Sequence, residues 1–109
     1  MKRSLLSICL AIWFVISVIS PASAGEIANS AKLFNANCSA CHMGGNNVII
    51  SSKTLKQEAL DKYGMASLDA IKHQITNGKN AMPSFRSRLK DDQIEDIANY
   101  VMTQSQQGW

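Results

Sequence analysis

Apolar residues recur at helical spacing in four segments of the chain. The most regular segment is Asp91–Gln106, where Ile94, Ile97 and Val101 fall one turn apart along a single face. No segment shows the strict apolar–polar alternation that indicates a half-buried strand. The pattern therefore predicts an all-α domain. The other three predicted helices cover about Ile27–Asn37, Thr54–Tyr63 and Ser67–Asn77.

The predicted helix starts carry side chains that cap helices. Thr54–Gln57 has the spacing of a capping box, in which a hydroxyl and an amide side chain satisfy free backbone N–H groups. Ser67 is the predicted N-cap of the third helix. Asp91 or Asp92 is expected to cap the fourth, because acidic side chains also suit the positive end of the helix dipole.

Two long segments, 43–53 and 78–89, lack helical periodicity. Loops of this length in a small domain usually bind something or wrap around it. The apolar helix positions, with a few from the loops, are expected to form the core. This predicted core comprises Phe34, Leu55, Leu60, Leu68, Ile71, Ile75, Phe85, Leu89, Ile97 and Val101.

The N-terminal segment 1–24 has the features of a secretory signal peptide. Lys2 and Arg3 precede an uncharged, mostly apolar run, and Ala22–Ala24 supplies the small residues of a cleavage site. The alternative is a permanent membrane anchor, but the run is slightly short for the ~20 residues of a spanning helix. We therefore expect cleavage at this site, no stable membrane insertion afterwards, and one domain over residues 25–109.

Composition limits what this domain could bind. Loss of Lys2 and Arg3 with the signal peptide lowers the formal net charge from +3 to +1, so no strongly basic surface argues for nucleic acid. Of the three cysteines, Cys9 also leaves, and Cys38 and Cys41 are too close together to close a useful disulfide loop. A domain this small needs some other reinforcement of its core.

Residues 38–42 form a C-x-x-C-H motif. The thiols of Cys38 and Cys41, on one helical turn, can form thioethers with the two vinyl groups of a single haem. His42 can then offer an imidazole nitrogen to the iron. A thioredoxin-like site would need a β-α-β context, and a zinc site would need further ligands, whereas the only other histidine is His73. The motif therefore predicts one covalently attached c-type haem.

Met82 is the candidate for the second axial ligand of the iron. It lies in the 78–89 segment and precedes Pro83, which disfavours helix at Met82 and keeps it extended. His/Met ligation raises the potential of a haem and closes its iron to small molecules. Met65 is the serious rival, and ordinary core packing is the other interpretation of Met82. His73 is expected on a solvated helix flank.

Together these motifs resemble the cytochrome c6 family, the soluble photosynthetic electron carriers of cyanobacteria and algal plastids. C-x-x-C-H alone marks only c-type cytochromes, but the Asn-Gly-Lys-x-Ala-Met-Pro run at 77–83 is much more specific. The similarity covers essentially all of residues 25–109. It is carried by Phe34–Gly45, Lys53–Lys56, Gln74–Pro83, Tyr100–Val101 and Gly108–Trp109.

The resemblance implies an all-α class I cytochrome c fold, with about four helices around one covalently bound haem. It implies an electron carrier rather than an enzyme, a monomer that passes single electrons from the cytochrome b6-f complex to photosystem I. The expected location is the thylakoid lumen of a cyanobacterium or a plastid. The residues carried over are Cys38 and Cys41 for the thioethers, His42 and Met82 for the iron, Gln74 near the haem, where it tunes the potential, and Arg88 for docking to photosystem I.

Several alternatives stay open at this point. Gln74 could be a solvated helix flank, and Arg88 an ordinary surface charge. Many family members have a proline just before Lys53–Lys56, and its absence here leaves open which backbone carbonyl orients the His42 ring. A class I cytochrome that donates to a terminal oxidase is the nearer alternative function. A haem enzyme or sensor with an open iron is the more distant one, and Met82 argues against it.

Overall fold

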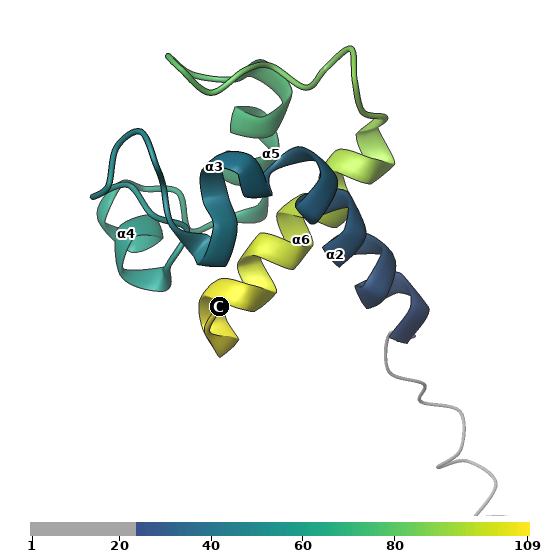
Figure 1. The fold of residues 1–109 in the computed structure, drawn as a ribbon, viewed down its shortest axis with the longest axis horizontal. Helices are drawn as coiled ribbons and strands as arrows, with labels where there is room; N and C mark the ends of the chain where they lie inside the picture. The colour runs from purple at the N-terminus through teal and green to yellow at the C-terminus, as the bar shows by residue number, and fades with distance from the viewer. Residues whose placement is uncertain (1–23) are drawn as a thin grey trace, which may run out of the picture.

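The computed structural model describes residues 24–109, and this part of the chain is helical (Figure 1). Apart from one isolated bridge between Lys79 and Met82, it contains no β-structure, so the predicted all-α class is confirmed. None of its helices is both long enough and apolar enough to cross a membrane. The predicted signal peptide, Ala24 apart, lies outside the described residues. The elements are α2 (Ala24–Asn37), α3 (Ser39–His42), the 3-10 helix η2 (Met43–Gly45), α4 (Gln57–Lys62), α5 (Leu68–Asn77) and α6 (Asp91–Gln107).

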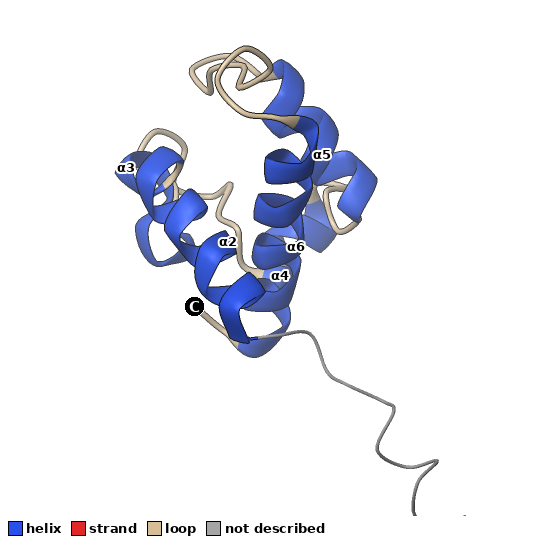
Figure 2. Cartoon of the chain, turned by 90° about the vertical axis from the view of Figure 1, so that its right-hand side faces the viewer, coloured by secondary structure: helices blue, strands red, loops and turns tan. Residues whose placement is uncertain are grey.

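The core forms where α2 and α5 pack against α6 (Figures 1 and 2). The apolar stripe of α6 is almost fully buried, with Ile94 and Ile97 each 1% exposed. Of the predicted core, Leu55, Leu68 and Leu89 are only partly buried and pack against its margin. The rest are buried, as predicted. The buried apolar set is Phe34, Leu60, Ile71, Ile75, Phe85, Ile94, Ile97, Ala98 and Val101.

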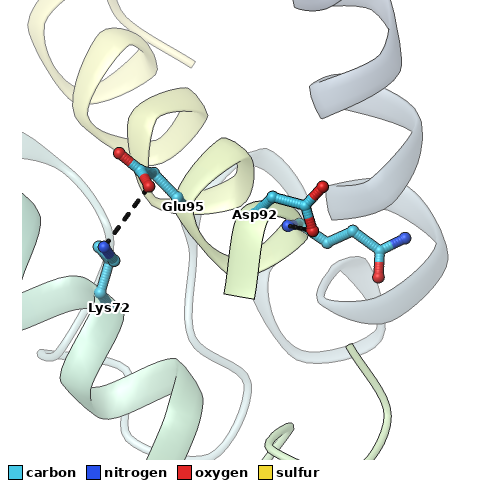
Figure 3. Close-up of polar contacts among 4 residues, drawn as sticks. Lys72, Asp92 and Glu95 are labelled. Atoms are coloured by element: carbon cyan, nitrogen blue, oxygen red, sulfur yellow. Dashed lines mark hydrogen bonds and ion pairs between the residues drawn. The ribbon is translucent and has the colours of Figure 1, made fainter. Parts of the chain in front are cut away.

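A surface ion pair also links α5 to α6. Lys72 Nζ lies 3.6 Å from Glu95 Oε2, and both side chains are at least one-third exposed (Figure 3). Exposed pairs of this kind contribute about 0.2–1 kcal/mol. The packing of α5 on α6 therefore depends mainly on the apolar contacts beneath this pair.

The predicted cap of α5 is confirmed, but the predicted capping box of the second helix is wrong. The Ser67 hydroxyl accepts a hydrogen bond from the Ala70 N–H (3.1 Å). Thr54 instead accepts from the Lys56 N–H (3.3 Å), and α4 begins only at Gln57. The Gln57 side chain is engaged elsewhere, since its Nε2 donates to Asp61 (2.9 Å) and its Oε1 accepts from the Ser105 hydroxyl (3.2 Å).

The cap of α6 also differs from the prediction. Lys90 occupies the N-cap position, and the Gln93 side chain accepts a hydrogen bond from the Lys90 N–H (2.9 Å). Asp92, shown in Figure 3, accepts from the N–H of Gln93 (3.0 Å) from inside the first turn. Asp91 and Asp92 therefore complement the helix dipole without being the N-cap residue.

Candidate haem-binding site

The C-x-x-C-H motif lies at the junction of α2 and α3. The Cys38 N–H donates to the Phe34 carbonyl (2.8 Å), and the His42 N–H donates to the Cys38 carbonyl (2.9 Å). This nearly continuous helical path explains how one turn presents both thiols and the imidazole to the same region. Both thiols are free; Cys38 is half-buried and Cys41 is exposed.

Burial raises the pKa of the Cys38 thiol to about 11, with a smaller contribution from the neighbouring Cys41. The thiol is therefore neutral at physiological pH. A thioether is neutral as well. This wall of the site carries no charge from Cys38 either before or after a covalent bond to a haem vinyl group.

The motif side chains line a cavity of about 500 Å³. This volume is within the range of about 300–1,000 Å³ that is usual for small-molecule and cofactor sites. Its walls come from α2, α3, the loop after α3, α4, α5, the loop that follows α5, and α6. In Figure 2 the α3 segment and the loop after α5 lie apart from each other. Most of the predicted core lines this space, namely Phe34, Leu55, Leu60, Ile71, Ile75, Phe85, Ile97 and Val101. The apolar core therefore forms much of the wall of this cavity.

The Lys and Arg residues in the cavity lining, Lys53, Lys79 and Arg88, are not matched by any Asp or Glu among the described lining residues. The Lys53 ammonium lies 5.3 Å from the centre of the Tyr63 ring, and the Arg88 guanidinium 5.6 Å from that of Phe85. A haem brings two ionised propionates, which need positive charge nearby. The apolar walls and the basic charges together fit a haem.

The orientation of the His42 ring is fixed by the backbone. His42 Nδ1 lies 2.9 Å from the carbonyl oxygen of Asn46. Because a carbonyl can only accept, Nδ1 carries the proton and Nε2 keeps its lone pair free for a metal. This bond answers which carbonyl orients His42, a question that the sequence left open. A backbone carbonyl has no sequence signature, so only the path of the loop reveals it.

Met82 reaches the cavity from a tight turn after α5. The Lys79 N–H donates to the Met82 carbonyl (3.0 Å), and the Met82 N–H donates back to the Lys79 carbonyl (2.9 Å). Asn80, between them, has a φ of +53°, a conformation that asparagine tolerates better than most residues. These bonds hold the Met82 backbone in one position, which suits a residue that presents its side chain to a fixed point.

Gln74 faces the cavity from α5, between Ile71 and Ile75. Its Nε2 lies 3.6 Å from the Met82 sulfur and donates to it. The side chain is partly buried, so the interpretation of Gln74 as a solvated flank is wrong. Gln74 is therefore in direct contact with the candidate ligand.

Other candidate metal ligands are less well placed. Met65 also lines the cavity, so lining alone does not separate it from Met82. His73 is exposed, and Asn77 Nδ2 donates to its carbonyl (2.8 Å), as expected for a solvated flank. Within residues 24–109, no group of three or more His, Cys, Asp or Glu side chains could hold a metal ion.

Comparison with known proteins agrees with this geometry. A family model described as cytochrome c oxidase, cbb3-type, subunit III matches residues 25–101. The chain is 52% identical to cytochrome c6 of Thermosynechococcus vestitus, over 100% of this chain and 98% of that protein. It is 60% identical to cytochrome c6 of Bumilleriopsis filiformis, over 77% of this chain and 98% of that protein. The crystal structure of cytochrome c6 from the diatom Phaeodactylum tricornutum superimposes with a TM-score of 0.74 at 48% identity, covering 76% of this chain and 98% of that chain. The chain therefore belongs to the cytochrome c6 family of electron-transfer proteins, which carry a covalently bound haem.

Proposed function

We propose that this protein carries single electrons from the cytochrome b6-f complex to photosystem I. In this proposal Cys38 and Cys41 form the thioethers, and His42 and Met82 are the axial ligands. One geometric observation carries the proposal. His42, whose ring is held with the Nε2 lone pair free, and Met82, whose backbone is held by paired hydrogen bonds, line the same apolar cavity. The haem, when bound, supplies a one-electron Fe(III)/Fe(II) couple.

In this function the polypeptide keeps the two axial ligands in fixed positions. The Asn46 carbonyl fixes the His42 ring, and the paired hydrogen bonds of Lys79 and Met82 fix the methionine loop. Two ligands that stay in place in both oxidation states keep the reorganisation accompanying electron transfer small. They also occupy both axial positions, which favours an electron carrier over a haem enzyme or sensor.

The direct test is flash-induced reduction of photosystem I by the purified haem-loaded protein. We expect a second-order rate constant on the order of 10⁷ M⁻¹s⁻¹ at low salt, as for electrostatically assisted association. In parallel, the oxidised protein should be reduced by the b6-f complex supplied with quinol. Efficient oxidation by a terminal oxidase, with negligible transfer to photosystem I, would favour the respiratory alternative instead.

We propose the thylakoid lumen as the location, reached after removal of residues 1–24. Ala22–Ala24 supports a cleavage site of this kind. The N-terminal sequence of the protein isolated from lumenal extracts is expected to begin at Gly25. An intact N-terminus in the membrane fraction would indicate a retained anchor.

Arg88 is proposed to assist docking to photosystem I. It is exposed and beside Phe85 at the cavity, where a partner would approach the haem. Arg88→Gln is expected to slow photosystem I reduction about three- to tenfold at low salt, with a smaller effect at high salt, because peripheral charges act mainly on association. Lys32→Gln removes an equal charge from an exposed position of α2 and serves as the control. Equal rates of photosystem I reduction for the two variants would show that Arg88 has no specific role in docking.

Gln74 is proposed to raise the haem potential through Met82. An N–H donated to the sulfur withdraws electron density from it, and a weaker donor sulfur favours Fe(II). Gln74→Leu is therefore expected to lower the midpoint potential by about 40 mV, the equivalent of a hydrogen bond of about 1 kcal/mol for one electron. Gln104→Leu, on α6 and outside the cavity lining, is the control. Redox titration of both variants measures this change in midpoint potential. An unchanged or higher midpoint potential in Gln74→Leu would contradict the proposed role of Gln74.

A further inference from the structure

The indole of Trp109 packs directly on the backbone of Gly45. A Cβ added to Gly45 would lie 2.4 Å from Trp109 Cγ, closer than non-bonded carbons approach, and Gly45 has a φ of +76°. Gly45 is buried, although its neighbours Gly44 and Asn46 are exposed. The contact is therefore specific to one residue of the loop that follows His42.

Hydrogen bonds extend this contact to the other end of the loop. Trp109 Nε1 donates to the Leu55 carbonyl (3.0 Å), and the Leu55 N–H donates to the Gly45 carbonyl (2.7 Å). The ring is itself held from behind, with its centre 5.3 Å from that of Phe34 and 6.0 Å from that of Tyr100. Trp109 thus joins both ends of the 45–55 loop to the aromatic side chains of α2 and α6.

Within the loop, the Asn47 side chain makes three hydrogen bonds to the backbone. Asn47 Oδ1 accepts from the N–H groups of Ile49 (3.0 Å) and Ile50 (2.9 Å), while its Nδ2 donates to the Lys53 carbonyl (2.9 Å). These bonds give the loop its shape. Two backbone bonds attach its first part to the preceding helical turns: the Val48 N–H donates to the Cys41 carbonyl (3.1 Å) in α3, and the Asn46 N–H donates to the Met43 carbonyl (3.2 Å) in η2. Trp109 adds the attachment to α2 and α6.

We infer that Trp109 is a positioning residue for the His42 ring: its indole holds Gly45 in place, so that the Asn46 carbonyl stays within hydrogen-bond distance of His42 Nδ1. The inference rests on the proposed role of His42 as an axial ligand. Asn46 is exposed, so without this support water competes for the Nδ1 proton. A carbonyl that accepts this proton makes the imidazole a stronger donor to iron and favours Fe(III). Loss of Trp109 therefore weakens the donation from His42 to iron and shifts the equilibrium toward Fe(II).

The test uses two readouts on the haem-loaded protein that loss of stability alone does not move. One is the midpoint potential, and the other is the solvent-exchange rate of the His42 Nδ1 proton in the ferrous protein, measured by NMR. Trp109→Ala is expected to raise the potential and to speed the exchange about tenfold, because one local hydrogen bond opens more often. Trp109→Phe keeps a ring over Gly45 and is expected to restore most of both values. If Trp109→Ala yields no holoprotein, Trp109→Leu takes its place with the same expected directions.

Ile94→Val is the matched control, because Ile94 is a buried α6 residue that does not line the cavity. It should lower the stability modestly and leave both readouts unchanged. The inference is overturned if the Trp109 variants lose stability but keep wild-type potential and exchange, if Ile94→Val reproduces their effects, or if Trp109→Phe behaves like Trp109→Ala. Failure of the proposed function looks different: the His42 ring protons of the wild-type ferrous protein would lack the strong upfield shift that an axial ligand experiences above a porphyrin.

Discussion

Replacing Met82 by alanine is expected to convert an electron carrier with a closed iron into a haem protein that binds carbon monoxide in its ferrous state. The thioether of Met82 is the proposed sixth ligand, and Met82 supplies the only sulfur atom in the Lys79–Met82 turn. Loss of a Met ligand should also lower the midpoint potential, by on the order of 0.1–0.3 V, because thioether ligation favours Fe(II). Carbon monoxide titration and redox titration of the purified variant measure these two effects.

Two other methionines provide matched controls for this substitution. Met65 lines the same cavity, so Met65→Ala tests the rival ligand directly. Met102 is partly buried against the core on α6 and does not line the cavity, so Met102→Ala measures the general effect of losing a methionine. Both controls are expected to keep a closed iron. Carbon monoxide binding by Met65→Ala together with a closed iron in Met82→Ala would transfer the axial role to Met65.

Gly78→Ala is expected to destabilise the protein by about 3 kcal/mol and to loosen the methionine turn. Gly78 has φ +70° and ψ 175°, a region used almost only by glycine. An added Cβ would also lie 2.6 Å from the Met82 carbonyl oxygen and 2.7 Å from atoms of Pro83 and Ser84. Strain and collision each cost about 1–3 kcal/mol. Denaturant unfolding of the haem-loaded protein gives the change in stability.

Gly64→Ala separates the cost of backbone strain from the cost of steric collision. Gly64 has a similar φ of +68°, but no atom lies within 4 Å of where its Cβ would be. It should cost only about 1 kcal/mol, from the backbone alone, and leave the sixth ligand in place. Carbon monoxide binding should therefore increase in Gly78→Ala and not in Gly64→Ala. Similar losses in the two variants would mean that the contact between Gly78 and the Met82 turn is unimportant.

The helices and the core were predictable from the sequence because they depend on local periodicity. The apolar stripe of α6 is buried as its spacing predicts, and Ser67 caps α5 through a bond to a residue three positions away. The C-x-x-C-H motif was equally readable, since covalent attachment requires a fixed local spacing. In each case the interacting groups lie within about two helical turns of one another.

Features that depend on distant partners, or on the path of an irregular loop, were missed. Thr54 is not the cap because α4 begins only at Gln57, whose side-chain oxygen accepts a hydrogen bond from the distant Ser105 instead of from the backbone near Thr54. The bond from His42 to the Asn46 carbonyl follows from the path of an irregular loop. The contact between Gly45 and Trp109 joins two ends of the domain that no local pattern relates.

The optical spectrum of the purified wild-type protein, oxidised and reduced, tests the His42/Met82 assignment most directly. We expect sharp bands of a reduced low-spin c-type haem. The oxidised protein should also show a weak long-wavelength band that arises from iron–sulfur charge transfer and is lost in Met82→Ala. A high-spin spectrum without that band, in fully haem-loaded wild-type protein, would contradict it and indicate an open or differently ligated iron.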